Sequence, residues 1–266
     1  MSQAWMILSG KGGVGKSTIT SGLGMALAAH EMKCCCVDAD IGLRNLDMLL
    51  NMQSKVVYDV LDVVHKDCKL KYALLNDALH EGLSLLPASQ LGNANDMSAG
   101  DMDRIVKKLK KRAAYVLLDA PAGIGRGVKN LLPCVDHTLL VTTADDVAIR
   151  DAERVIALLE EAGKGRPMLI VNRVIPEMVV SGEMYSPQTV AETLDVPLLG
   201  YVPEDRAVIA AINRHESYME RPCPAKEAMD RIAQRFLGEY IPMPDFAPKR
   251  KGFFGWLRRK EKPLEF

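Results

Sequence analysis

The stretch of the sequence that most constrains the fold is Gly10–Ser17, whose sequence is GKGGVGKS. It follows the apolar run 4–8 and precedes a helix-compatible segment over 18–30. This order of strand, glycine-rich turn and helix is the context that a phosphate-binding P-loop requires. Glycines let backbone N–H groups point at phosphate oxygens, and the N-terminus of the following helix attracts the same anion. The sequence therefore predicts a nucleotide site in which Lys16 reaches the β- and γ-phosphates and the Ser17 hydroxyl coordinates Mg²⁺.

The apolar runs predict an α/β fold. We expect strands over 4–9, 33–38, 83–88, 114–119, 137–142, 167–172 and 197–202. We expect helices near 16–30, 56–64, 101–112, 146–163, 186–194, 206–214 and 222–238. Continuous apolar strands that alternate with helices are typical of a mostly parallel twisted sheet with helices on both faces. The 266 residues suffice for one large P-loop NTPase domain, which we place at 1–241.

Carboxylates follow two of the predicted strands. Asp38 and Asp40 stand two residues apart after the second strand, and Asp119 ends the apolar run 115–118 in the layout of a Walker B strand. Because ligands bind at the carboxyl ends of parallel strands, these acids are expected at the edge that carries the P-loop. Asp119 would hold Mg²⁺ through water or through Ser17. Of the other pair, one carboxylate could face Mg²⁺ and one an attacking water, although capping of a turn would also explain them.

The P-loop also carries Lys11, and the run Lys11–Lys16 resembles the deviant Walker A loop of the ParA/MinD ATPase family. The segment after the second strand is similar to the same family's switch I. The resemblance implies a homodimer formed with ATP, in which each Lys11 reaches the phosphates held by the other subunit. It also implies that Asp40 orients the hydrolytic water while Asp38 supports Mg²⁺. Lys11, Lys16 and Asp40 are thus the expected catalytic residues, and Ser17, Asp38 and Asp119 the expected metal site.

The family resemblance extends to a base pocket. It implies that Asn172 hydrogen-bonds adenine, with Arg173 and Pro203 packing near the faces of the base; an Asn cap at a turn is the plainer alternative for Asn172. The absence of a GTPase-type Asn-Lys-x-Asp motif modestly favours ATP. The residues expected to bind nucleotide are Lys11, Gly12, Gly13, Val14, Gly15, Lys16, Ser17, Thr18, Asn172, Arg173 and Pro203.

The composition changes after residue 241. A Pro-rich linker over 242–248 leads to a tail over 249–266 with seven Lys/Arg and two Glu, so that a neutral chain has a tail of +5 and a body of −5. At about 100° per residue, one helical arc of roughly 160° holds four large apolar residues of the tail. These residues, expected to bind membrane, are Phe253, Phe254, Trp256 and Leu257. The pattern predicts an amphipathic helix on an anionic membrane surface, with a docked terminal helix and a basic nucleic-acid arm as alternatives.

Other features bear on the compartment. The chain enters its first predicted strand within a few residues, which leaves no room for a signal peptide. No apolar run approaches the roughly 20 residues needed to span a bilayer, and the six cysteines form no C-x-x-C pair. The sequence thus predicts a cytoplasmic protein that binds reversibly to the inner face of the cell membrane.

The resemblance implies an ATPase that positions the bacterial division site. Its expected partners are a MinC-type division inhibitor, which binds the ATP dimer, and a MinE-type activator of hydrolysis. The alternatives are a ParA-like DNA-partition ATPase, a flagellar-number ATPase of the same lineage and a nucleotide switch without real turnover. The acidic body and the aromatic tail argue against nucleic acid as a partner.

Overall fold

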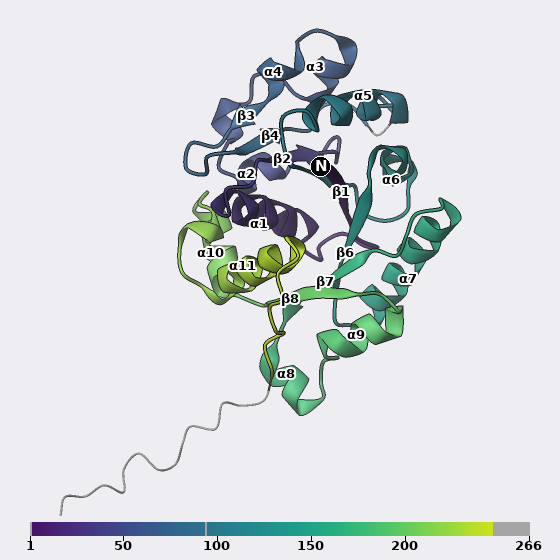
Figure 1. Cartoon of the computed structure of the whole chain (residues 1–266), viewed down its shortest axis with the longest axis vertical. Helices are drawn as coiled ribbons and strands as arrows, with labels where there is room; N and C mark the ends of the chain where they lie inside the picture. Colours follow the sequence, from purple (N-terminus) through teal and green to yellow (C-terminus); the bar gives the residue numbers. More distant parts are fainter. Residues whose placement is uncertain (1, 94, 247–266) are drawn as a thin grey trace, which may run out of the picture.

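The computed structural model describes residues 2–93 and 95–246, and in this part of the chain an eight-stranded sheet organises the fold (Figure 1). The strand order is β3-β4-β2-β5-β1-β6-β7-β8, and every neighbouring pair except β3–β4 is parallel. The strands are β1 (Gln3–Leu8), β2 (Cys34–Asp38), β3 (Leu75–Asn76), β4 (Leu83–Leu86), β5 (Tyr115–Asp119), β6 (His137–Thr143), β7 (Met168–Val174) and β8 (Leu198–Pro203). The predicted α/β fold with a mostly parallel sheet is confirmed.

Helices cover both faces of the sheet, as predicted. The helices of four or more residues are α1 (Lys16–Ala29), α2 (Leu46–Leu49), α3 (Val60–His65), α4 (Leu70–Ala73), α5 (Ala99–Leu109), α6 (Arg126–Leu131), α7 (Asp146–Glu161), α8 (Pro176–Ser181), α9 (Pro187–Leu194), α10 (Arg206–Asn213) and α11 (Pro224–Phe236). Short 3₁₀ turns occupy Gln53–Lys55, Leu132–Cys134 and Tyr218–Glu220. Figure 1 places α1, α10 and α11 on one side of the sheet and α5, α6, α7 and α9 on the other.

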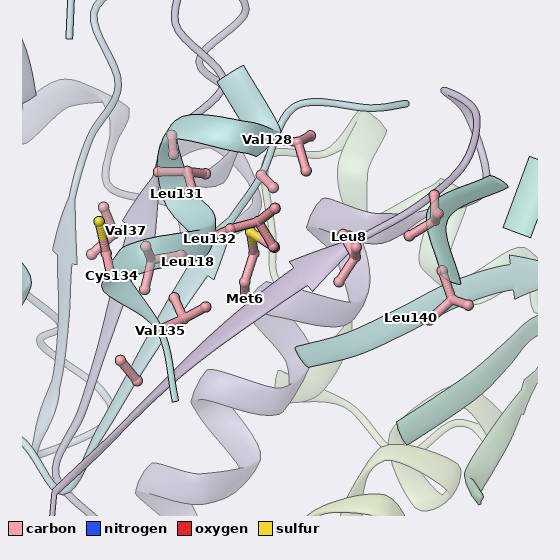
Figure 2. Close-up of a cluster of buried hydrophobic side chains, with 14 of the residues drawn as sticks. Met6, Leu8, Val37, Leu118, Val128, Leu131, Leu132, Cys134, Val135 and Leu140 are labelled. Atoms are coloured by element: carbon pink, nitrogen blue, oxygen red, sulfur yellow. The ribbon is translucent and has the colours of Figure 1, made fainter. Parts of the chain in front are cut away.

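Alternation along the strands divides the core into two layers. On β1, Met6 and Leu8 face one layer, while Trp5 and Ile7 face the other. Figure 2 shows Met6 and Leu8 among apolar side chains of α6 and the turn after it, including Leu132. The second layer packs α1 and α11 against the opposite face. Since both faces are buried, the strands are apolar at nearly every position, which is why their sequence is continuous rather than alternating.

Capping residues set the helix starts that periodicity alone misplaced. The helix predicted over 56–64 begins instead at Val60, because the Asp59 carboxylate accepts the backbone N–H groups of Leu61 and Asp62. The helix predicted from 101 begins at Ala99 after Ser98, which forms a second capping box with Asp101. The antiparallel β3 and the short helices α2, α4, α6 and α8 were not predicted.

The end of the described chain lies between α11 and the predicted membrane-binding tail. No helix of the described residues is long and apolar enough to cross a membrane. Residues 241–246 belong to no helix or strand and follow the turn after α11. The tail at 249–266, including the four apolar residues expected to bind membrane, lies outside the described residues.

Candidate functional site

The P-loop takes the conformation that its glycines predict. It joins β1 to α1, and Gly13 and Gly15 adopt left-handed φ values of 82° and 90°. Residues with a side chain are strained at such angles. A Cβ at Gly15 would also lie 2.2 Å from the Asn172 Nδ2 atom, so the turn requires glycine for space as well as for conformation. The loop thereby brings backbone N–H groups to the N-terminus of α1.

Asp119 is the centre of a buried polar cluster at the start of α1. Its Oδ1 lies 2.8 Å from Lys16 Nζ, and its Oδ2 accepts a 2.6 Å hydrogen bond from the Ser17 hydroxyl. The Thr20 hydroxyl donates to Oδ1 as well, at 3.0 Å. Lys16 and Asp119 are both buried, so this ion pair lies in a medium that screens it weakly. The structure brings Lys16, Ser17 and Asp119 together at the edge of the sheet that carries the P-loop. Thr20, which joins them, was not predicted.

Asp38 holds the loop that follows β2. Its carboxylate accepts hydrogen bonds from the backbone N–H groups of Asp40, Asn45 and Leu46 at 2.9–3.1 Å. Asp38 and Asp119 are also register partners on the adjacent strands β2 and β5. Burial and then the neighbouring charge of Asp119 raise the pKa of Asp38 to about 7, although the three amide hydrogen bonds oppose this shift.

A cavity of about 350 Å³ opens beside this cluster. Asp40, from the loop after β2, lines it together with residues of the P-loop and of the start of α1: Gly12, Gly13, Gly15, Lys16, Ser17 and Thr18. Burial raises the pKa of Asp40, an effect that the charge of Lys16 partly offsets. The cavity thus has ammonium and hydroxyl donors and glycine backbone from the P-loop and α1 and a carboxylate from the loop after β2. A phosphate chain fits the donors, and a water molecule could donate to the carboxylate.

The donor set of this cluster fits a hard divalent cation. Asp38 and Asp119 bring two buried carboxylates together, and the Ser17 hydroxyl adds a third oxygen. The charge of Asp119 contributes to the raised pKa of Asp38, so an added positive charge would relieve this repulsion. Mg²⁺ favours oxygen ligands and keeps several waters. Accordingly, the described residues form no closed cluster of three or more His, Cys, Asp or Glu.

A second cavity, of about 240 Å³, continues from the P-loop toward β8. Asn172, Arg173 and Pro203 line it together with Gly13, Gly15 and Thr18, as the sequence predicts for a base pocket. A bulge between Val171 and Val174 and a left-handed φ of 59° at Arg173 interrupt β7 at this point. Apolar side chains form much of the wall, and most of these were not predicted: Ile19, Val202, Val208, Ile209, Ile212 and Tyr218.

Two predicted pocket residues are also fixed by other groups. The Asn172 side chain is buried and donates from Nδ2 to the Val14 carbonyl at 2.8 Å, which ties β7 to the P-loop. Arg173 forms a two-point ion pair with Glu204, at 2.8 and 3.3 Å. Asn172 therefore supports the P-loop backbone as well as lining this second cavity.

Lys11 lies apart from Lys16. Its ammonium group is 3.4 Å from Asp145, and the two side chains remain 34% and 50% exposed. Lys11 lines a third cavity of about 480 Å³, which includes Gly12, Gly13, Val14 and Arg173 but not the buried cluster. Burial would raise the pKa of Asp145, but hydrogen bonds from Thr143, the Ala148 N–H and Lys11 outweigh it and lower that pKa. Lys11 thus pairs with the N-cap residue of α7 and takes no part in the cluster around Asp119.

Comparison with known proteins identifies the relatives of this site. Residues 5–218 match the CobQ/CobB/MinD/ParA nucleotide binding domain. A septum site-determining protein MinD of Helicobacter pylori is 40% identical over 259 residues, which cover 95% of this chain and 96% of the relative. The matched residues 5–218 include the P-loop and the strands that carry Asp38, Asp119 and Asn172.

Solved structures agree with these matches. A MinC:MinD cell division protein complex of Aquifex aeolicus matches with a TM-score of 0.85 and 36% identity, covering 92% of this chain and 99% of that one. A septum site-determining MinD of Pyrococcus horikoshii, complexed with Mg-ADP, matches with a TM-score of 0.79 and 26% identity, covering 89% and 96%. The sequence identity to these relatives, the share of the chain that they cover and the common fold show the family of this chain. It belongs to the MinD septum site-determining proteins within the CobQ/CobB/MinD/ParA nucleotide-binding family.

Proposed function

We propose that this chain is an ATPase that binds ATP with Mg²⁺, pairs with a second copy and then binds the inner face of the cell membrane. The observation that carries the proposal is the contrast between two lysines of one loop. Lys16 is buried against Asp119, whereas the Lys11 side chain is about one third exposed, pairs with Asp145 and does not line the cavity beside Asp119. A lysine of the P-loop that is accessible and takes no part in the cluster of its own subunit could reach the phosphates held by a partner subunit.

Within one subunit the chemistry follows from the cavity. The P-loop N–H groups and Lys16 would hold the phosphates, and Ser17, Asp38 and Asp119 would hold Mg²⁺ and its waters. When bound, Mg²⁺ would neutralise charge on the phosphate oxygens. Asp40 would accept a hydrogen bond from the attacking water and orient it toward the γ-phosphate. Proteins mainly position groups and stabilise charge in phosphoryl transfer, so this arrangement suits hydrolysis to ADP and phosphate.

Membrane binding would come from the tail. One basic amphipathic tail is short and binds an anionic surface weakly, but a dimer carries two tails on one body. The second tail then binds at a high effective concentration, which raises the overall affinity without a new contact. ATP would thereby control membrane binding through dimerisation, and hydrolysis would release the protein. On the membrane the dimer would recruit a MinC-type division inhibitor, and a MinE-type activator would stimulate hydrolysis.

The proposal is tested by sedimentation with anionic vesicles under ATP and under ADP, with naked DNA in a parallel series. We expect ATP-dependent sedimentation with vesicles and none with DNA. DNA binding that depends on ATP, without vesicle binding, would identify a DNA-partition ATPase instead. Phosphate release measured in the same samples separates an ATPase from a switch that binds nucleotide without turnover.

The role of Lys11 is tested separately with the Lys11→Ala variant. We expect loss of the ATP-dependent dimer in analytical ultracentrifugation, because no lysine would then reach the partner's phosphates. Nucleotide binding to the monomer should persist, since Lys16 and the P-loop backbone remain. Dimerisation of this variant at the wild-type ATP concentration would contradict the assignment.

A further inference from the structure

The segment that connects the body to the tail is fastened to the edge of the sheet. After α11 the chain runs past β8, the last strand of the sheet, and residues 241–246 pack there without forming a strand. Such a Pro-rich segment is expected from its sequence to be a semi-rigid spacer. Contacts with two residues of the body, Arg235 and Tyr201, hold it instead.

Arg235 on α11 supplies the first set of contacts. Its guanidinium donates to the carbonyls of Ile241 at 2.7 Å and Pro242 at 2.8 Å, and to the carbonyl of Leu199 on β8 at 3.2 Å. One planar side chain thus joins the end of α11, the edge strand and the start of the segment. Three donors in a fixed plane hold their acceptors in a defined geometry, which a lysine would not do.

Tyr201 on β8 supplies the second set. Its hydroxyl donates to the carbonyl of Pro244 at 3.2 Å, and its ring packs on Phe246 with the ring centroids 4.8 Å apart. Both rings are half-buried and lie against the core layer on the far side of the sheet from α11. We call residues 241–246, with Arg235 and Tyr201, the strap. The strap crosses the sheet edge from one helical layer to the other.

The strap matters because of where the tail begins. The sequence leaves two residues, Ala247 and Pro248, between Phe246 and the basic run that starts at Lys249. We propose that Arg235, Tyr201 and Phe246 are positioning residues that fix the point at which the membrane-binding tail leaves the body, at the β8 edge. The inference rests on the proposed membrane function and adds its geometry: the β8 edge is held next to the lipid surface by a tether of two residues rather than seven.

A short tether raises the effective concentration of the second tail of a dimer. Beyond the length that just spans the two binding sites, this concentration falls as roughly the −3/2 power of tether length, so releasing the strap should weaken vesicle binding by roughly threefold to tenfold. Releasing it should also let the body turn freely above the bilayer. Vesicle affinity and orientation therefore provide two independent readouts.

The test uses the full chain with ATP, Mg²⁺ and vesicles that contain anionic lipid. The releasing variant is Tyr201→Ala combined with Phe246→Ala, which frees the segment beyond Pro242 while Arg235 still holds the carbonyls of Ile241 and Pro242. Its matched control is Tyr240→Ala, which removes an aromatic ring of the same region whose exposed fraction is 92%. We expect the double variant to need a several-fold higher lipid concentration for half-maximal binding, and the control to bind like the wild type. Thermal midpoints and nucleotide affinity show whether the body remains folded.

Orientation is read with a dye on Cys68, since the other five cysteines are buried. The loop between α3 and α4, which carries Cys68, lies at the opposite end of the molecule from β8 (Figure 1). With the strap intact this end should stay away from the bilayer, so energy transfer from the dye to acceptor lipids should be low. We expect the transfer to rise in the double variant and to stay low in Tyr240→Ala.

An insertion after Phe246 tests the strap without removing Tyr201 or Phe246, in case the double variant unfolds. Five Gly/Ser residues inserted after Phe246 lengthen the free tether from two residues to seven when the strap is docked, but from seven to twelve when it is not. The −3/2 power then gives a loss of about sixfold for a docked strap and about twofold for a free one. A loss of vesicle affinity near twofold on insertion would contradict the docked strap. So would a folded double variant whose vesicle affinity and energy transfer to acceptor lipids equal those of the wild type. If the wild-type protein does not bind vesicles in the presence of ATP, the proposed membrane function itself is wrong.

Discussion

Lys11 and Lys16 stand five residues apart in one loop and have opposite surroundings. Lys16 lies in the protein interior against Asp119, with the hydroxyls of Ser17 and Thr20 on the same carboxylate. Lys11 meets Asp145 at 3.4 Å with both side chains substantially exposed. Water screens the second pair and not the first. The two lysines should therefore differ in what they do for the free protein.

Unfolding without nucleotide measures this difference. Asp119→Ala leaves the ammonium of Lys16 buried and unpaired, and we expect a loss of about 3–5 kcal/mol in the free energy of unfolding, as for broken buried ion pairs. Lys11→Ala removes an exposed pair, and we expect a change of no more than about 1 kcal/mol. Urea denaturation of the two variants and the wild type gives both values. Similar losses would contradict the assignment of the two environments.

The sequence predicted the meeting of Lys16, Ser17 and Asp119 because each position belongs to a motif with a fixed place on a strand or turn. Thr20 was missed, although a signal exists: it lies four residues after Lys16 on α1 and so shares its helix face. The apolar walls of the cavity that we propose as a base pocket had no such signal. Val208 and Ile212 look like ordinary core positions of a short amphipathic helix, and nothing local says that their face lines a cavity.

At the scale of elements, the same reasoning explains which parts of the fold could be predicted. Strands buried on both faces give unbroken apolar runs, so all seven long strands appear in the sequence. Helices of four to six residues such as α2 and α6 are too short for a 3.6-residue period to emerge. The first residues of these helices depend on local capping and loop geometry, which the periodicity of apolar residues does not report.

Helix α7 packs closely against the P-loop at Gly10, a contact that the P-loop motif itself does not predict. A Cβ at Gly10 would lie 2.3 Å from the backbone carbon and oxygen of Asp151 on α7, whereas a Cβ at Gly12 would meet nothing within 4 Å. Gly10 is therefore needed for packing between elements. Gly12, whose φ lies outside the left-handed region, could carry a side chain in the free protein.

Alanine at these two glycines tests the contact. For Gly10→Ala we expect a loss of about 1–3 kcal/mol in the free energy of unfolding, because backbone must move to admit the methyl group. For Gly12→Ala, measured without nucleotide, we expect no loss. Thermal or urea unfolding of both variants decides the matter. An equal tolerance of the two substitutions would mean that α7 does not pack on the loop as described.

At the scale of the whole molecule, charge is divided between two parts. The chain is neutral, but residues 249–266 carry +5 and the rest carries −5. The sequence predicts an extended linker between them and cannot say where it lies, because the strap depends on Arg235 and Tyr201, up to 45 residues before Phe246. Nucleotide-dependent pairing is expected from the body, and lipid attraction from the tail.

Truncation before Lys249 separates these two properties. We expect the truncated protein to dimerise with ATP like the full chain, because Lys11, Lys16 and both cavities remain, and to lose vesicle binding because the cations and apolar side chains are gone. Lys11→Ala in the full chain is the complementary variant: it keeps the tail but should not dimerise, so it should bind vesicles weakly and equally with ATP and ADP. Vesicle sedimentation measures the membrane binding of each variant, and analytical ultracentrifugation measures its ATP-dependent dimerisation.

The full chain adds a salt dependence to this comparison. Near an anionic surface each basic residue contributes on the order of 1 kcal/mol, and this attraction decays within a Debye length. Raising the ionic strength should therefore weaken vesicle binding of the full chain while leaving its ATP-dependent dimer largely intact, since the phosphates that each Lys11 would reach are enclosed between the two subunits and do not lie at a lipid surface. If salt dissociated the dimer at the concentration that releases it from vesicles, the two properties would not reside in separate parts of the molecule. Vesicle binding by the truncated protein would lead to the same conclusion, because the acidic body would then have to contact lipid by itself.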